Sequence, residues 1–265
     1  MTTTDTTPDC AYRTAPAGQP VDTADPSTYF AGRFAGRVII VTGAAGGLGS
    51  ITVDRLAREG ATVVGTDVVD SDPNTTFLDV TDRAAWDRVV ANTLTTHGRL
   101  DGALFAHGIQ GPETSISTMP FEGWGRTLSV NLDGCFHGLA ALLPTLTAQG
   151  YGRVAILSSI SAREGNPHQA AYSASKAAVV SLVKTAAKEV AAHNVTVNAI
   201  APSLMQTRML DDLTPERNAA LLARVPMGRV GSTAEFSALA TWLLSAEASY
   251  MTGQTLDLSG GRNTA

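Results

Sequence analysis

From residue 37 onward, short apolar runs alternate with longer stretches in which apolar residues recur every three or four positions. The first run, Val38 to Val41, is continuously apolar, which is typical of a strand buried on both faces of a sheet. Similar runs predict further strands at 61–66, 76–78, 102–105, 153–157, 195–200 and 254–258. The longer stretches predict helices at 48–59, 84–96, 121–146, 171–193 and 234–245.

Strands that alternate with helices indicate βαβ units, and these form a parallel sheet with helices on both faces. Right-handed crossovers then predict one fold class, an α/β protein with a doubly wound, Rossmann-like parallel sheet in three layers. Such sheets bind ligands beyond the carboxyl ends of their strands. We therefore expect the functional residues directly after the predicted strands.

The first 32 residues differ from the rest, because they are rich in Thr, Pro and Asp and contain no apolar run. They lack the features of a secretory signal. Residues 1–32 are predicted to be a disordered or loosely docked tail, although an arm that covers a neighbouring subunit is an open alternative. Residues 33–265 are predicted to form a single domain.

The composition is 44% hydrophobic and 16% charged, which is typical of a globular protein. A formal net charge of -5 gives no general attraction to nucleic acid or to an anionic membrane. No apolar stretch is long enough for a membrane span, and no His, Cys or carboxylate cluster has metal-ligand spacing. The two cysteines, Cys10 and Cys135, are expected to be free thiols in a reducing cytoplasm. These features predict a cytoplasmic protein without a metal, a nucleic-acid partner or a membrane partner.

A glycine-rich turn joins the first predicted strand to the first predicted helix. Glycines let the backbone turn sharply and approach a pyrophosphate, and the helix start offers free N–H groups to its phosphates. The position of this turn between a buried strand and a helix favours a dinucleotide site over a simple tight turn. The residues expected to contact the cofactor here are Gly43, Gly47, Leu48 and Gly49.

Asp67 ends the second predicted strand. A carboxylate at that position can accept hydrogen bonds from the adenosine ribose hydroxyls, and it would repel the 2′-phosphate of NADP. The glycine turn contains no Arg or Lys, and Val68 follows Asp67. The sequence therefore favours NAD as the cofactor.

Tyr172 and Lys176 are four residues apart at the start of a predicted helix, so they share one helix face. A neighbouring ammonium favours the phenolate and lowers the pKa of a tyrosine. Such a pair can exchange a proton with an alcohol or a carbonyl. Ser159 follows the fifth predicted strand, where its hydroxyl can hydrogen-bond the reacting oxygen.

Together with the glycine turn, these residues resemble the short-chain dehydrogenase/reductase family over about residues 36–261. The resemblance implies that Tyr172 is the acid/base residue, that Lys176 lowers its pKa and holds the nicotinamide ribose, and that Ser159 positions the substrate oxygen. It also implies that Asn131 holds a water for proton relay. The remaining cofactor contacts implied by the resemblance are Asp79, Val80, Ala106, Gly108, Leu204 and Thr207.

The chain also departs from the family pattern. This chain has Phe105-Ala106-His107-Gly108 where the family usually has Asn-Asn-Ala-Gly, and Ser203 stands where the family usually has glycine. We expect His107 to be a packed, hydrogen-bonded substitute. His168 is expected either in an exposed loop or at the substrate mouth, and Ser158 and Ser161 are expected to be structural or to line the pocket.

The resemblance implies an NAD-dependent dehydrogenase that interconverts a small-molecule secondary alcohol and its ketone. Two alternatives are an NADPH-dependent ketoreductase and a non-catalytic nucleotide-binding protein. The segment 203–229 covers the substrate in this family and is rich in Leu and Met here, which favours a mostly apolar or cyclic substrate. A homotetramer is expected by resemblance, with apolar helix faces as further support; for the 171–193 helix these are Val179, Leu182, Val183, Ala186 and Val190.

Overall fold

The computed structural model describes residues 29–69, 75–207 and 215–263. Within them, seven parallel strands form one sheet in the order β3-β2-β1-β4-β5-β6-β7. The chain builds outward from β1 to β3 and then returns to place β4 on the other side of β1. The carboxyl ends of β1 and β4 therefore flank the switch point at which doubly wound sheets bind ligands. The strands are β1 (Val38–Thr42), β2 (Thr62–Asp67), β3 (Thr75–Phe77), β4 (Gly102–Phe105), β5 (Gly152–Leu157), β6 (Val195–Pro202) and β7 (Thr255–Leu258).

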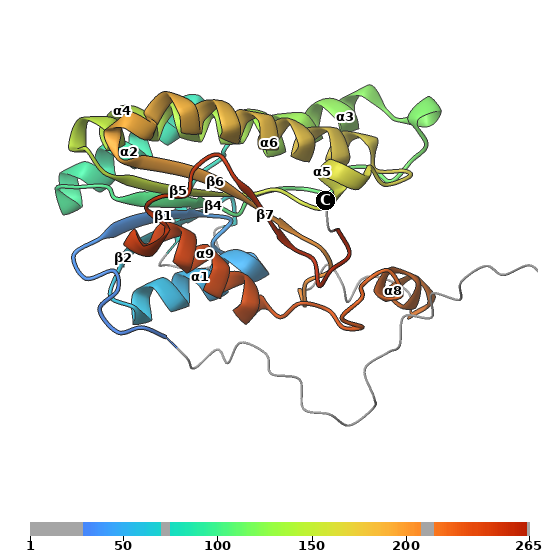
Figure 1. The fold of residues 1–265 in the computed structure, drawn as a ribbon. Helices are drawn as coiled ribbons and strands as arrows, with labels where there is room; N and C mark the ends of the chain where they lie inside the picture. The colour runs from blue at the N-terminus through green and yellow to red at the C-terminus, as the bar shows by residue number, and fades with distance from the viewer. Residues whose placement is uncertain (1–28, 70–74, 208–214, 264–265) are drawn as a thin grey trace, which may run out of the picture.

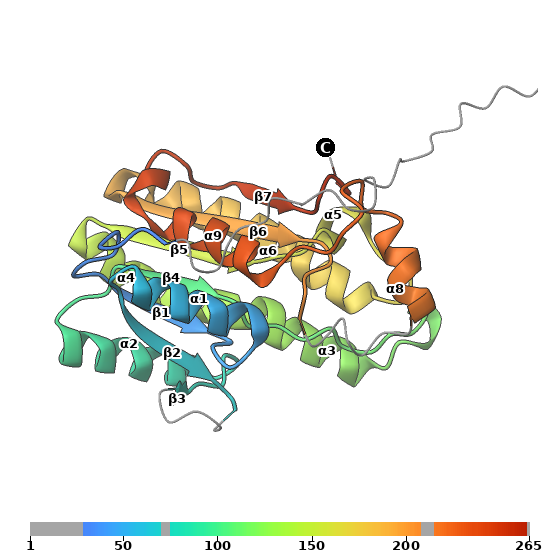
Figure 2. The ribbon, with the colours of Figure 1, turned by 90° about the horizontal axis from the view of Figure 1, so that it is seen from below.

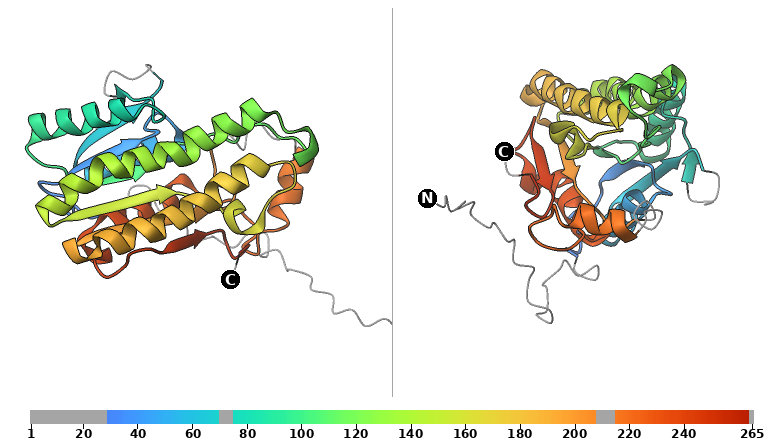
Figure 3. Two further views of the ribbon diagram at one scale, coloured as in Figure 1. Left: turned by 90° about the horizontal axis from the view of Figure 1, so that it is seen from above. Right: turned by 90° about the vertical axis from the view of Figure 1, so that its right-hand side faces the viewer.

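Helices cover both faces of the sheet, which confirms the predicted three-layer α/β architecture (Figure 1). One face carries α2, α4 and α6, and the other carries α1 and α9, an arrangement that is also visible from above and from the side in Figure 3. The α-helices are α1 (Gly47–Arg58), α2 (Arg83–His97), α3 (Phe121–Leu128), α4 (Gly134–Gln149), α5 (Ser161–Glu164), α6 (Ala170–Val190), α8 (Pro215–Leu222) and α9 (Thr233–Leu244). Short 3-10 turns lie at Ile116–Thr118, Ala191–His193 and Ala246–Ala248.

Local capping explains where several helices begin and end. The Asp82 side chain accepts a hydrogen bond from the Ala84 N–H at the start of α2, and Gly98 ends that helix in the left-handed conformation. Ser232 and Glu235 form a capping box at the start of α9. These contacts satisfy backbone groups that a helix end would otherwise leave unpaired.

The sheet separates two apolar cores. The core on the α2, α4 and α6 face contains Val179, Val183, Ala186 and Val190, with Leu182 packed against it. These side chains are thus covered by the sheet and helices of the same chain. They therefore give no support to an oligomer, and the homotetramer stays a prediction that rests on the resemblance alone.

The predicted helix at 121–146 is interrupted. A π-helical turn at Ser129–Asp133 separates α3 from α4, and it centres on the buried Asn131. The Asn131 side chain bonds the backbone of Ile109 through both its oxygen and its nitrogen. A π-turn inserts one residue into the helix, so it can direct this side chain inward, and such turns are frequent at functional sites. The apolar pattern also did not predict the short helices α5 and α8.

Residues 1–28 lie outside the described residues, so the domain boundary at residue 32 stays a prediction. Cys10 falls in that segment, whereas Cys135 is a buried free thiol. Among the helices that the structure describes, none combines the length and the apolar character needed to cross a membrane.

Candidate active site

Backbone crowding surrounds the glycine-rich turn between β1 and α1. Gly43 has a positive φ of 65°, and a Cβ there would lie 2.9 Å from the backbone carbonyl of Ala106. A Cβ on Gly49 would lie 2.0 Å from the Gly43 oxygen, and one on Gly47 would lie 3.3 Å from the Thr207 methyl group. Side chains at these three positions would therefore clash with or crowd the turn that the sequence assigns to the cofactor.

The start of α1 is built to face an anion. Its N-cap is Gly46, which makes no side-chain capping bond, and its first turn contains no acidic residue. The N–H groups and the positive end of the helix dipole therefore point at an open backbone cradle. This arrangement fits the diphosphate of a dinucleotide, and the adjacent Leu48 lines the neighbouring cavity.

Asp67 lies at the carboxyl end of β2, beside the same turn. Its carboxylate accepts hydrogen bonds from the N–H groups of Ala45, at 3.0 Å, and Val68, at 2.7 Å. These bonds fix the carboxylate at the rim of the cradle, where an adenosine ribose would lie. The predicted position of Asp67 is thus compatible with its assigned role.

Three other cofactor contacts implied by the resemblance lie after β3 and β4. Asp79 accepts bonds from the N–H and the hydroxyl of Thr81, at 2.9 and 2.7 Å. Val80 is buried. A Cβ on Gly108 would lie 3.2 Å from Lys176 Nζ and 3.3 Å from Asn131 Oδ1. Glycine at 108 therefore leaves the lysine and asparagine side chains free to approach this loop closely.

His107 is buried in the same loop. Its Nδ1 lies 2.6 Å from the Thr42 hydroxyl, and its Nε2 lies 3.6 Å from Cys135 Sγ. Burial, with a smaller contribution from the charge of Lys176, lowers the pKa of His107 to about 3, so the ring is neutral. The packed, hydrogen-bonded interpretation of His107 is confirmed. The exposed His168, by contrast, lies outside the residues that line the cavity.

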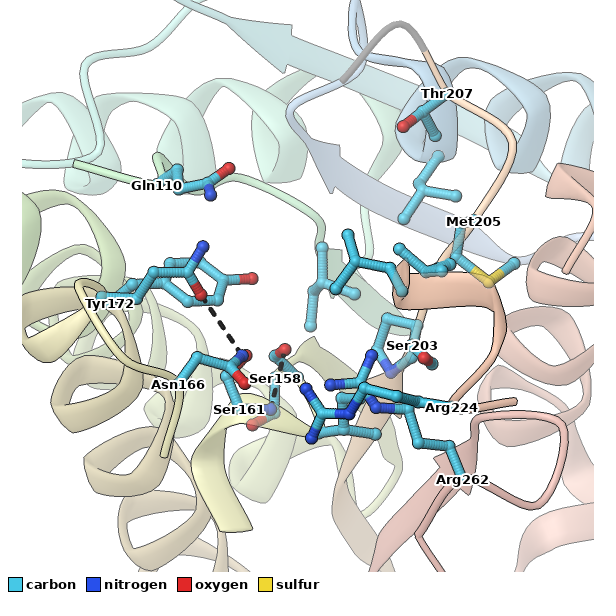
Figure 4. A pocket seen from close by; sticks show the side chains of 18 of the residues that line it. Gln110, Ser158, Ser161, Asn166, Tyr172, Ser203, Met205, Thr207, Arg224 and Arg262 are labelled. Carbon is cyan, nitrogen blue, oxygen red and sulfur yellow. Dashed lines mark hydrogen bonds between the residues drawn. The ribbon is translucent and has the colours of Figure 1, made fainter. Parts of the chain in front are cut away.

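The side chains of Ser159, Tyr172 and Lys176 come together beyond β5 and at the start of α6. Ser159 and Tyr172 line one cavity, where Figure 4 shows the Tyr172 phenol directed into the open space. Lys176 Nζ lies 5.8 Å from the centre of the Tyr172 ring and donates a 2.7 Å hydrogen bond to the Leu157 carbonyl. Asn131 reaches the same helix, because its side-chain nitrogen donates to Ser175 Oγ at 3.0 Å. The structure therefore brings all four predicted catalytic residues to one region.

The pKa of Tyr172 differs from the expectation that Lys176 would lower it. Burial raises the pKa of Tyr172, and a hydrogen bond with Ser159 acts in the opposite direction. Burial also lowers the pKa of Lys176 to about 8. The Lys176 ammonium bonds a backbone carbonyl, and burial dominates the Tyr172 pKa in the protein alone.

Comparison with known proteins identifies the family. The family described as enoyl-(acyl carrier protein) reductase matches residues 43–263. The chain is 35% identical to 2-dehydro-3-deoxy-L-rhamnonate dehydrogenase (NAD(+)) from a Sphingomonas species, over 89% of this chain and 98% of that protein. It is 36% identical to the 3-oxoacyl-(acyl-carrier-protein) reductase FabG of Thermotoga maritima, over 86% and 98% of the two chains. The crystal structure of NAD+-bound xylitol dehydrogenase superimposes with a TM-score of 0.81 at 30% identity, covering 86% and 99%.

The chain belongs to the short-chain dehydrogenase/reductase family. Proteins with these names are oxidoreductases, and this chain shares their function at that level, as an enzyme that uses a nicotinamide cofactor and acts on a small molecule. The glycine cradle, the uncapped helix start and the strand-end carboxylate fit such a cofactor.

The cavity of this family member has a volume of about 340 Å³ and opens beyond the carboxyl ends of the strands. Leu48, Leu204 and Thr207 border it on the side predicted for the cofactor, and Ser158 and Ser161 also line it. Arg224, from the 203–229 segment, also lines the cavity, and sequence reasoning missed four further polar lining residues. The missed residues are Gln110, Asn166, Gln169 and Arg262. Among the described residues, no group of three or more His, Cys, Asp or Glu side chains could hold a metal ion.

Proposed function

We propose that this enzyme is an NAD-dependent dehydrogenase that transfers a hydride between NAD and a secondary alcohol, giving the ketone reversibly. The observation that supports this most directly is the meeting of Ser159 and Tyr172 in a cavity whose other border is formed by Leu48 and Thr207. A substrate between these borders would lie against both the phenol and the expected position of the nicotinamide.

In this proposal, Ser159 donates a hydrogen bond to the substrate oxygen and Tyr172 exchanges the proton with it. Lys176 holds the nicotinamide ribose, and Asn131 holds a water in a proton relay. When bound, the oxidised nicotinamide accepts the hydride and brings a positive charge to the site. Positive charges from that ring and from Lys176 favour the phenolate, so the Tyr172 pKa is expected to be lower in the complex with NAD than in the protein alone.

NAD is preferred over NADP in this proposal because of Asp67. Its carboxylate stands at the rim of the cradle, and its described hydrogen bonds are to backbone N–H groups. A negative group there repels a 2′-phosphate. The name of the Sphingomonas relative also specifies NAD(+). The competing NADPH-dependent ketoreductase would need a cation near the ribose.

The substrate side of the cavity has mixed character. Leu204, Met205 and Leu221 line it, which supports the expectation of apolar substrate surface. Met209, Leu210 and Leu213, on which that expectation also rested, lie outside the described residues. The predicted cytoplasmic location and homotetramer remain part of the proposal, since they follow from the sequence and its resemblance.

Steady-state turnover of a panel of secondary alcohols, measured with NAD and with NADP, tests the proposal. We expect Tyr172-dependent reduction of NAD, with kcat lowered by about 100- to 10,000-fold in Tyr172→Phe. NAD affinity should persist in that variant, because only the hydroxyl is lost. Tyr250→Phe is the matched control, since Tyr250 is fully exposed and does not line the cavity. Wild-type kcat in Tyr172→Phe would refute the assigned mechanism, and a higher kcat/KM with NADP would refute the cofactor assignment.

A further inference from the structure

Three charged residues from distant parts of the chain meet at the substrate side of the cavity. Glu164 ends α5, Arg224 follows α8, and Arg262 follows β7. Arg262 bonds both oxygens of Glu164, with Nε–Oε1 at 3.1 Å and Nη2–Oε2 at 2.7 Å. Arg224 Nη2 lies 2.8 Å from the same Oε2. Figure 2 shows α8 beyond the carboxyl ends of the strands, and α5 near it.

This cluster has more positive than negative charge, because two guanidinium groups share one carboxylate. The Arg262 side chain is only 5% exposed. Both arginines line the cavity, and among its described lining residues there is no Asp or Glu. Glu164 already pairs the buried Arg262, so the surplus positive charge falls on Arg224, which is half-exposed at the cavity and which a bound anion would neutralise.

The geometry leaves donors for such an anion. Among the described residues, the bonds to Glu164 engage Nε and Nη2 of Arg262 and Nη2 of Arg224, which leaves Nη1 of each arginine for a ligand. Figure 4 shows both guanidinium groups reaching toward the middle of the pocket, near Ser161. Planar guanidinium groups recognise carboxylates through paired hydrogen bonds.

The neighbouring side chains can bind hydroxyl groups. Asn166 donates a 2.7 Å hydrogen bond to Ser161 Oγ and also lies 3.3 Å from the Gln169 oxygen. These residues line the cavity together with Gln110. The cavity of about 340 Å³ must also admit the nicotinamide ring, so it leaves room only for a small substrate.

We propose that the substrate is a small hydroxy carboxylic acid whose carboxylate is bound by Arg224 and Arg262; this rests on the proposed dehydrogenase function. In the reaction, the carbinol C–H bond breaks and its hydride passes to NAD. The hydroxyl proton passes to Tyr172, the ketone forms, and the carboxylate is unchanged. The product is therefore an oxo acid.

The test compares short aliphatic secondary hydroxy acids with their own methyl esters, using NAD and the wild-type enzyme. We expect kcat/KM to be about 10- to 100-fold higher for the acids, since a charge-assisted pair of hydrogen bonds is lost in the ester. Arg224→Gln and Arg262→Gln should reduce this acid-to-ester ratio, mainly through a higher KM for the acid. Arg229→Gln is the matched control, because it breaks an Arg–Glu pair, with Glu235, that does not line the cavity. Glu164→Gln should increase the ratio.

Calorimetric titration of the hydroxy acids into Tyr172→Phe with bound NAD measures recognition separately from turnover. Binding of the acids without turnover in wild type would refute the dehydrogenase function and leave the anion site standing. Turnover with equal kcat/KM for acids and esters would overturn the anion site and leave the dehydrogenase function standing. Absence of both binding and turnover would also overturn the anion site. If Arg262→Gln does not fold, the half-exposed Arg224 still decides the outcome.

Discussion

Two walls of the cavity are built from different kinds of structure. The catalytic wall, formed by Ser159 and Tyr172 with Lys176 behind them, lies at the end of β5 and on the 21-residue helix α6. Buried hydrogen bonds hold it, such as those from Lys176 to Leu157 and from Ser158 to the Lys176 carbonyl. The catalytic groups are therefore fixed by elements that also form the core.

The outer wall, formed by Leu204, Met205, Leu221 and Arg224, comes from the segment after β6 and from the end of α8. Leu221 is half-buried and Arg224 is exposed, and few of these groups belong to a core. In the proposed mechanism, the chemistry is therefore encoded in regular, buried structure, whereas substrate choice is encoded in loops and short helices that can change at little cost in stability. Substitutions on the two walls should therefore have different effects.

The largest difference is expected from a matched pair of serines, one on the catalytic wall and one on the strand end that leads into the outer wall. Ser159→Ala should lower kcat by about 100- to 1,000-fold, because it removes a hydrogen bond to the reacting oxygen. Ser203→Ala should have little effect on kcat, although Ser203 also lines the cavity. Similar losses in the two variants would contradict the distinction between the walls.

Because of Lys176, the free energy of unfolding of the protein should depend on pH. Burial lowers the pKa of Lys176 from 10.5 to about 8, so between these values the unfolded chain binds a proton that the folded chain has released. Stability from this residue is therefore lower at pH 7 and rises as the pH passes through about 8 toward 10.5. Denaturant unfolding without cofactor measures this. From pH 7 to pH 10, the free energy of unfolding of the wild type should rise by about 2 to 3 kcal/mol relative to that of Lys176→Met. A constant difference would contradict the burial of a titrating ammonium.

Asp67 provides a smaller effect at the cofactor end of the cavity. Asp67→Ala should narrow the ratio of kcat/KM for NAD over NADP by at least about 10-fold, since it removes the repulsion of the 2′-phosphate. Asp67→Asn keeps the shape without the charge and should narrow the ratio as well. An unchanged ratio in both variants would show that the carboxylate does not determine cofactor choice.

The smallest effect is expected on the outer wall itself. Leu221→Ala should raise KM for the best substrate by about 3- to 10-fold at nearly constant kcat, because a few methyl and methylene groups are lost from a half-buried contact. Leu222→Ala, on the same helix but outside the cavity lining, is the control. A fall in kcat comparable to that of Ser159→Ala would show that the outer wall contributes to the chemical step, which would contradict the distinction between the two walls.

Features that depend on local sequence could be predicted, whereas features that depend on contacts between distant segments could not. The buried strand Val38–Thr42 is apolar from Val38 to Val41, and the Tyr172–Lys176 spacing is local to one helix, so both can be recognised without the fold. The meeting of Glu164, Arg224 and Arg262 depends on three segments up to 98 residues apart, and no local spacing records it. The π-turn at Asn131 also escaped prediction, and the Asn131 side chain there bonds the Ile109 backbone, which no local apolar pattern records. The fall in the Tyr172 pKa was predicted from its neighbour Lys176 alone, whereas burial by the whole fold dominates it in the protein without cofactor.

The shared packing of α1 and α9 has a consequence for how the chain is made. Phe34 and Leu56 lie in one core with Phe236 and Leu243, yet the end of α1 and the start of α9 are about 175 residues apart. During synthesis at about 5–20 residues per second, the N-terminal half emerges roughly 10 to 35 seconds before the helix that completes this core. Every strand pair of the described sheet is parallel and depends on a crossover, so we expect distant contacts to make folding slow. The nascent N-terminal half thus exposes apolar surface for that interval, and we expect the chain to be most prone to aggregation at this stage.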